Sequence, residues 1–333
     1  MRIEELTIAE WERNLPESGF SVFHTPEALE VLEKHSPGDL RLYGGFKGEQ
    51  PIALLPVFVR RNAVGRAVLS PPPSRNVPNL GPILMPTSPK RLKRERVNRR
   101  FTQQILEECG VDSRRTLFRM ICSPPYRDPR PYSWADLDVG TTFTYVLDID
   151  SSTPDELMDS FSSSLRREIR NAEELDIRVG VENEDAVPDI YDLVQSRYRD
   201  QGESTPLTAE YVDDVATELG DRSRVYVVRA PDGEFLNGIV VLYSNDTAYF
   251  WLGGTRTTYE DVSINSLLHW RIITDIAEDP ELESISEFDL VGANTERLCK
   301  YKAKFGAELV PYYVIESAGT GMNLAKRAHE LVP

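Results

Sequence analysis

Lysine is scarce in this sequence and concentrated at one place. Three of the chain's eight lysines, Lys300, Lys302 and Lys304, fall within five residues. A lysine held beside a reacting carbonyl can stabilise the negative oxygen that develops during acyl transfer, and removing one such donor typically costs about 3 kcal/mol. The cluster is therefore a candidate functional site, within which Lys300 and Lys304 are expected to be solvated. Exposed lysines on a short helix are the alternative.

The segment around these lysines has the pattern of a strand, a tight turn, a short helix and a second strand. Residues 288–291 form a short apolar run that Gly292 ends, and Asn294 or Thr295 can cap the helix that follows. Gly306 stands where a C-cap glycine is expected, and a second apolar and aromatic run comes after it. The lysines are thus predicted to lie on a helix between two strands.

Asp289 is the charged residue of the first of these strands. Side chains alternate along a strand, so its carboxylate points away from the side on which Phe288 and Leu290 lie. If that face is covered, the carboxylate needs a partner, which could be a lysine or the amine of a substrate. A structural hydrogen bond to the turn is the alternative.

Two short motifs in this segment resemble the C-terminal signature of the FemAB-like branch of the GNAT acyltransferase superfamily. They are D-L-V-G-A-N at residues 289–294 and Y-K-A-K-F-G-A at residues 301–307. The branch includes the aminoacyl transferases that build peptidoglycan cross-bridges and the BioF2-like acetyltransferases. The resemblance implies that Lys302 is the catalytic residue, and Asp289, Asn294 and Tyr301 are candidates to contact the substrate. A helix cap is the simpler role for Asn294.

The order of expected elements is consistent with this resemblance. Between Phe143 and Ile315 the pattern is strand, helices, three antiparallel strands, helix, strand, helix, strand, which is the GNAT order. Residues 40–60 repeat the strand–turn–strand pattern of residues 225–243. We therefore expect an α/β fold of two tandem GNAT-like domains, residues 1–140 and 141–333, each a mixed sheet with helices on both faces.

Two helices of the second half have recognisable starts. A capping box at Thr153, with proline at the next position, opens a helix. We expect this helix to continue through Ala172 with one apolar stripe, and we expect Ser263 to cap a second amphipathic helix that ends near Ala277. The stripe consists of Leu157, Phe161, Leu165, Ile169 and Ala172.

Four further side chains are candidates for substrate contacts. Arg166, Arg167 and Arg170 could hold phosphates, because a guanidinium offers a bidentate fork; pairing with nearby glutamates is the alternative. Trp251 lies on the same strand face as Tyr249 and could line a substrate cleft, although core packing is the simpler interpretation.

The chain departs from acetyl-CoA-dependent GNATs in one loop. Those enzymes place an [RQ]xxGx[GA] loop before a helix, so that backbone amides cradle a pyrophosphate. Here residues 253–261 read G-G-T-R-T-T-Y-E-D, with the wrong spacing and two acids. This favours a donor other than an ordinary acyl-CoA, such as an aminoacyl-tRNA, while an acetyl-CoA enzyme with a divergent loop stays open.

The net charge indicates the salt concentration to which the protein is adapted. The net charge is −16, and arginine outnumbers lysine 30 to 8, which is typical of salt-adapted, haloarchaeal-type proteins. Dense carboxylates keep a surface hydrated, and molar salt screens their repulsion because the Debye length falls to about 3 Å. An ordinary acidic cytoplasmic protein is the alternative.

Composition and residue spacing argue against a metal site, a disulfide framework and a membrane-spanning helix. The three cysteines and four histidines are scattered without metal-ligand spacing, so no metal or disulfide framework is expected. No apolar run reaches the length of about 18–20 residues that a membrane helix needs. The N-terminus has no signal-peptide pattern, so we expect a cytoplasmic location.

One basic cluster contrasts with the acidic whole. Residues 90–100 contain seven lysines and arginines against the single acid Glu95. The cluster is either a solvated face or a contact for an anion or nucleic acid. It is the obvious place for tRNA to bind, although contacts to a nucleic-acid backbone weaken steeply with salt.

The sequence therefore predicts a transferase that moves an acyl or aminoacyl group onto an amine of a small molecule or cell-surface precursor. The donor would be an acyl-CoA or an aminoacyl-tRNA, and no metal is implied. The alternative of another class is a binding protein that keeps the double fold without catalysis.

Overall fold

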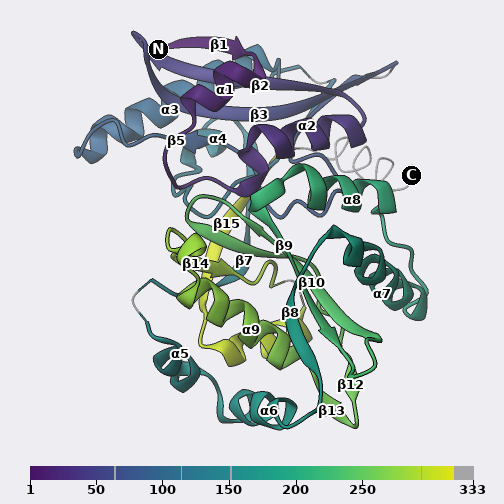
Figure 1. Ribbon diagram of the computed structural model, residues 1–333. Helices are drawn as coiled ribbons and strands as arrows, with labels where there is room; N and C mark the ends of the chain where they lie inside the picture. Colours follow the sequence, from purple (N-terminus) through teal and green to yellow (C-terminus); the bar gives the residue numbers. More distant parts are fainter. Residues whose placement is uncertain (64, 114, 151, 294, 319–333) are drawn as a thin grey trace. The chain divides into compact units, whose positions relative to one another are not determined.

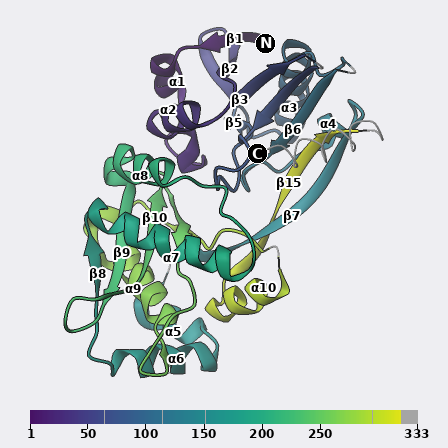
Figure 2. The ribbon, with the colours of Figure 1, turned by 90° about the vertical axis from the view of Figure 1, so that its right-hand side faces the viewer.

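The computed structural model describes residues 1–318 except 64, 114, 151 and 294. Its residues group into two compact units, one of residues 1–142 with the chain from Pro311, the other of residues 143–310. Figures 1 and 2 show mixed sheets and helices in both, which confirms the expected α/β class. The sequence assigned the segment after Pro311 to the second domain, whereas here it groups with the first, because the end of β15 pairs with β6.

The first unit is built on a mixed sheet in the order β1-β2-β3-β4-β6-β15, with β5 beside β3. All neighbours are antiparallel except the parallel pair β4 and β6. Its elements are β1 (Arg2–Leu6), α1 (Ile8–Asn14), α2 (Pro26–His35), β2 (Asp39–Lys47), β3 (Gln50–Asn62), β4 (Gly65–Ser70), β5 (Ile83–Leu84), α3 (Arg91–Glu108), β6 (Thr116–Ile121), α4 (Arg130–Ser133), the start of β7 (Leu137–Asp148) and the end of β15 (Glu308–Ser317).

The second unit holds the sheet β7-β14-β11-β10-β9-β8. β14 runs antiparallel to β7 and parallel to β11, and the strands from β11 to β8 form the expected antiparallel meander. Besides β7 and β15, its elements are α5 (Pro154–Ser160), α6 (Ser163–Glu173), β8 (Arg178–Glu182), α7 (Val187–Asp200), α8 (Ala209–Glu218), β9 (Ser223–Arg229), β10 (Phe235–Tyr243), β11 (Thr247–Gly253), β12 (Thr258–Tyr259), β13 (Val262–Ser263), α9 (Asn265–Glu278), β14 (Glu287–Asp289) and α10 (Glu296–Lys302).

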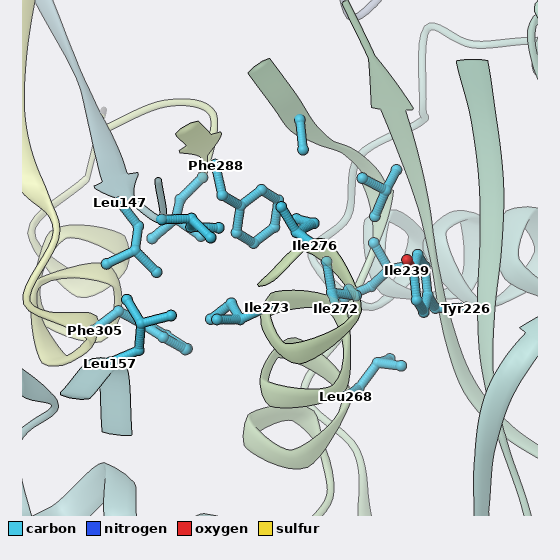
Figure 3. Packing of buried hydrophobic residues seen from close by; sticks show 14 of the residues in the cluster. Leu147, Leu157, Tyr226, Ile239, Leu268, Ile272, Ile273, Ile276, Phe288 and Phe305 are labelled. Atoms are coloured by element: carbon cyan, nitrogen blue, oxygen red, sulfur yellow. The ribbon is translucent and has the colours of Figure 1, made fainter. Parts of the chain in front are cut away.

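The core of the second unit forms around α9. The inner face of this helix packs against β9 and β10, and Ile239 of β10 belongs to the same cluster (Figure 3). Helices α7 and α8 contact the sheet strands on their own side. The sheet is thus buried on both faces, which suits apolar runs without alternation. The buried side chains of α9 in this cluster are Leu268, Ile272, Ile273 and Ile276.

Local capping signals explain where most helices begin. Thr25, Thr153 and Thr208 each accept a hydrogen bond from a backbone N–H of the helix that follows, and Thr295 does so for α10. Asn294, the other candidate cap of α10, lies outside the described residues. The capping box at Thr153 is confirmed.

Two predicted features of the helices are wrong. The helix that Thr153 opens ends at Ser160, because Phe161 and Ser162 are extended and Ser162 caps α6 anew. The apolar stripe is therefore shared by two helices, and its residues still contribute to one core. Ser263 does not cap α9; it lies in β13, and Ile264 takes the N-cap position without a side-chain hydrogen bond.

Candidate functional site

The candidate site begins where β14 and β11 part. Their parallel pairing ends at Tyr249 opposite Asp289. β14 stops there, whereas β11 continues to Gly253. The side chains of the site come from this point, from the turn after β14, and from α9 and α10.

Asp289 is buried at the end of β14. Its Oδ1 accepts hydrogen bonds from the Thr144 hydroxyl of β7 and from the backbone N–H of Val291, the latter at 2.7 Å. Burial raises the pKa of this carboxyl, and the two hydrogen bonds and the charge of Lys302 oppose the rise. The structural hydrogen bond to the turn, one of the two roles expected from the sequence, is present.

Lys302 is the buried cation of the site. It is the last residue of α10, and only 5% of it is exposed. Its Nζ donates to the carbonyl oxygens of Val291 and, at 2.8 Å, Gly292, and it lies 5.9 Å from the centre of the Phe250 ring. Burial lowers its pKa to about 8, against the pull of Asp289. A lysine with such a pKa exchanges its proton near neutral pH.

The turn at residues 290–293 is held from both sides. Val291 and Gly292 are in the left-handed region, with φ of 50° and 80°, a conformation that is costly for valine. Their N–H groups donate to Asp289 and Thr144, and their carbonyl groups accept from Lys302. Asp289 and Lys302 thus act on one turn without a direct contact being needed.

An aromatic cluster borders Lys302. The Tyr301 hydroxyl lies 3.5 Å from Nδ1 of His269, and both rings pack against Phe305. Burial lowers the pKa of His269 to about 4, so this imidazole is neutral at pH 7. Burial raises the pKa of Tyr301. The pair is therefore an uncharged donor and acceptor set.

Lys304 forms an ion pair with a residue of another helix, whereas solvation was the expectation for both Lys300 and Lys304. Its Nζ lies 2.8 Å from Oε1 of Glu168 on α6, and its side chain is 31% exposed. The Oε2 of Glu168 accepts from Ser266 of α9 at 2.9 Å. Lys300 is exposed and pairs with Glu296 one turn earlier. Glu168 thereby links α6, α9 and the end of the motif, and no local signal in the sequence pointed to it.

Among the described residues, no ion pair or hydrogen bond joins the three arginines of α6 to the groups around Lys302. Arg166 pairs with Asp159 at 3.3 Å, not with the glutamates that the sequence suggested. Arg167 and Arg170 are exposed, and among the described residues neither has an ion-pair partner. They are available to an anion, which stays a prediction.

Phe250 of β11, rather than Trp251, borders the candidate site. Trp251 is 4% exposed and packs edge-on against Tyr211 of α8, with ring centres 6.1 Å apart. This supports the core interpretation. Phe250 points the other way, to His269 and Lys302. Sequence reasoning missed Phe250 because a strand covered on both faces carries no polar side to mark its orientation.

The loop that precedes α9 forms a β-hairpin of β12 and β13. Asn237 is fully buried, and its Nδ2 donates to the Thr255 carbonyl and to Oδ1 of Asn265. Asn265 in turn donates to the carbonyl of Gly254, whose own N–H donates to a carbonyl of β10. The backbone N–H of Thr257 donates to Asn265. These amides are committed within the protein, which agrees with the departure from an ordinary pyrophosphate loop.

The comparison with protein families bears directly on this unit. Residues 159–303 match the family described as Acetyltransferase (GNAT) domain. This segment of the chain is therefore similar to GNAT acetyltransferase domains. The matched segment contains Asp289, Lys302, and the elements from α6 to α10 that surround them. The predicted class, a GNAT-type acyltransferase, is thus confirmed. No curated protein sequence matches the chain.

Solved structures resemble the chain over most or all of its length. FemX matches with a TM-score of 0.69 at 9% identity and covers 100% of both chains. A C-terminal domain assigned to a putative lysylphosphatidylglycerol synthetase of Agrobacterium fabrum matches with 0.58 at 14% identity, covering 98% of this chain and 96% of that one. L-PGS from Bacillus licheniformis matches with 0.54 at 13% identity, covering 91% and 96%. These likenesses confirm the FemAB-like double fold. None of the described helices is long and apolar enough to cross a membrane.

Proposed function

We propose that this GNAT acyltransferase moves an acyl or aminoacyl group onto the amine of a small molecule or cell-surface precursor, with Lys302 as the catalytic residue. The amine attacks the carbonyl carbon of the donor, and the bond from that carbon to the sulfur or oxygen of the donor breaks. The proton that the amine loses ends on the departing thiolate or alkoxide, which leaves as a thiol or a hydroxyl. The charge that must be stabilised is on the carbonyl oxygen of the intermediate.

The observation that supports this role is the pair of hydrogen bonds that Lys302 donates to the turn after β14. Its ammonium has three N–H donors, and two of them hold the carbonyls of Val291 and Gly292. One donor is left for the oxyanion. The turn fixes the position of the Nζ, so the donor needs no reorganisation when the charge develops.

The identity of the donor can be tested by ligand-dependent stabilisation. Acetyl-CoA, longer acyl-CoAs, and charged and uncharged tRNA are compared in thermal melts. A ligand at about 100 times its dissociation constant stabilises by about 2.7 kcal/mol, a shift of a few degrees for a chain of this size. Stabilisation by charged tRNA alone supports aminoacyl transfer of the FemAB kind. Stabilisation by a CoA supports BioF2-like acyl transfer in spite of the hairpin.

The role of Lys302 is tested with Lys302→Met in a transfer assay that uses the donor so identified. We expect kcat to fall about 100-fold or more, the usual cost of removing one oxyanion donor. Lys300→Met is the matched control, because Lys300 lies on the same helix and is exposed. Urea unfolding shows whether the variant is folded. A folded Lys302→Met variant with unchanged kcat would refute the role, and a wild-type chain that binds donors without transfer would favour the binding-protein alternative.

A further inference from the structure

The first half of α3 stands clear of the core of its unit. The buried side chains of this helix begin at Asn98, whereas residues 91–94 are all exposed. One end of α3 projects from the first unit in Figure 1. Lys90 occupies its N-cap position without a side-chain cap. Water can satisfy the free backbone N–H groups of this exposed helix end, and its side chains are accessible to a partner.

This helix end is also strongly basic. Residues 90–100 carry seven basic side chains and one acid in a chain of net charge −16. Positive charge at a helix N-terminus opposes the macrodipole, so these residues do not stabilise the helix itself. Arg91 and Arg130 share Glu95, the one acid of this segment, and Arg130 also pairs with Asp128. The remaining charges point to an anionic partner.

Two apolar side chains lie among these charges. Leu92 is 68% and Trp134 60% exposed, the highest values among the large apolar side chains that the structure describes. Trp134 follows α4, and the guanidinium carbons of Arg99 and Arg130 each lie 5.7 Å from its ring centre. Helical spacing places Leu92, Arg96 and Arg99 on one face of α3. We call Leu92, Arg96, Arg99, Arg130 and Trp134 the α3–α4 surface.

We propose that the α3–α4 surface docks the protein onto an anionic lipid membrane. Clustered basic residues are attracted to anionic headgroups, and a tryptophan beside arginines suits the boundary between headgroups and acyl chains. Leu92 decides for a membrane over a nucleic acid, because an exposed leucine offers nothing to phosphates but gains from entering the acyl region. The enzyme would then take its acceptor from the membrane surface. This consequence rests on the proposed transfer, whereas membrane docking itself does not.

The proposal is tested with vesicles of phosphatidylglycerol and phosphatidylcholine. Binding is measured by sedimentation at 0.15 M KCl, or at the lowest KCl concentration at which circular dichroism shows the chain folded. We expect Leu92→Ser and the double variant Arg96→Glu with Arg99→Glu each to reduce partitioning roughly tenfold or more.

Vesicles with brominated acyl chains test whether Trp134 reaches the membrane. We expect brominated lipids to quench the fluorescence of the wild type but not that of Trp134→Phe. The reason is that the other three tryptophans, Trp11, Trp251 and Trp270, are buried or packed against a core. Quenching that is the same in both proteins would contradict the placement of Trp134.

Matched controls lie outside the surface. Val181→Ser removes another exposed apolar side chain, and Arg13→Glu with Lys47→Glu reverses two exposed charges. These variants should bind vesicles like the wild type. Equal losses in test and control variants would overturn the proposal, as would an absence of vesicle binding. Binding to tRNA that is insensitive to Leu92→Ser and displaces the vesicles would reassign the surface to a nucleic acid.

Discussion

At the scale of single residues, burial favours the uncharged forms of Asp289 and Lys302. It raises the pKa of Asp289 and lowers the pKa of Lys302, and each is partly held charged by the other. Such opposed shifts are frequent at functional sites, because they provide groups that exchange protons near neutral pH. Here the two groups also form hydrogen bonds to Val291, whose φ is positive. The side chains whose pKa values are shifted are therefore the same ones that hold the turn in place.

Two buried histidines make stability depend on pH. Burial lowers the pKa of His24 and of His269 to about 4, against about 6.5 in an unfolded chain. Between these values the unfolded chain binds more protons, so their contribution is complete above pH 6.5 and is lost as the pH falls toward 4. The full loss is about 3 kcal/mol for each histidine. We expect urea unfolding between pH 7 and 4.5 to show this decline.

Substitutions distinguish the contribution of the histidines to the pH dependence of stability from that of the carboxylates, which titrate in the same pH range. His24→Gln and His269→Gln should each flatten the pH dependence of the unfolding free energy, whatever their effect at pH 7. His35→Gln, at a half-buried position on α2, is the control. A pH dependence that is the same in all four proteins would contradict the assignment.

Among the elements, the helix that carries Lys302 depends on how it ends. Gly306 ends the turn after α10 with φ of 70°. A Cβ atom there would also lie 3.0 Å from the carbonyl oxygen of Ser160, at the end of α5. Gly306, which follows the segment from Asp289 through Lys302, therefore packs closely against the end of α5.

We expect Gly306→Ala to lower the unfolding free energy by roughly 1–3 kcal/mol, because alanine is strained at positive φ and its methyl group meets a backbone atom. Gly180→Ala is the matched control, since Gly180 lies in β8 without a positive φ and with nothing within 4 Å of an added Cβ. Urea unfolding of both variants measures the difference. Equal stability of the two would show that the turn relaxes without cost.

For the molecule as a whole, the acidic balance is the dominant property. With a net charge of −16, the carboxylates of the chain repel one another in dilute buffer. Molar salt screens this repulsion because it shortens the Debye length to about 3 Å. We expect the chain to lose structure in dilute buffer and to regain it in molar KCl. Circular dichroism melts at both concentrations measure this. Melts that do not differ would refute salt adaptation.

Features that act over a few residues could be read from the sequence. Threonine caps, the capping box at Thr153 and the C-cap at Gly306 mark element ends, because each satisfies backbone groups of its own turn. The motif from Asp289 to Gly306 predicted strand, turn and helix correctly, and with the element order it predicted the GNAT-like fold.

Which distant side chains meet was visible in the tertiary structure alone. It placed Phe250 rather than Trp251 beside Lys302, and it paired Lys304 with a glutamate 136 residues earlier. It also broke the predicted long helix at Phe161, so that two short helices cover one core. Strand faces buried on both sides, and ion pairs between separate helices, depend on packing that no local pattern in the sequence records.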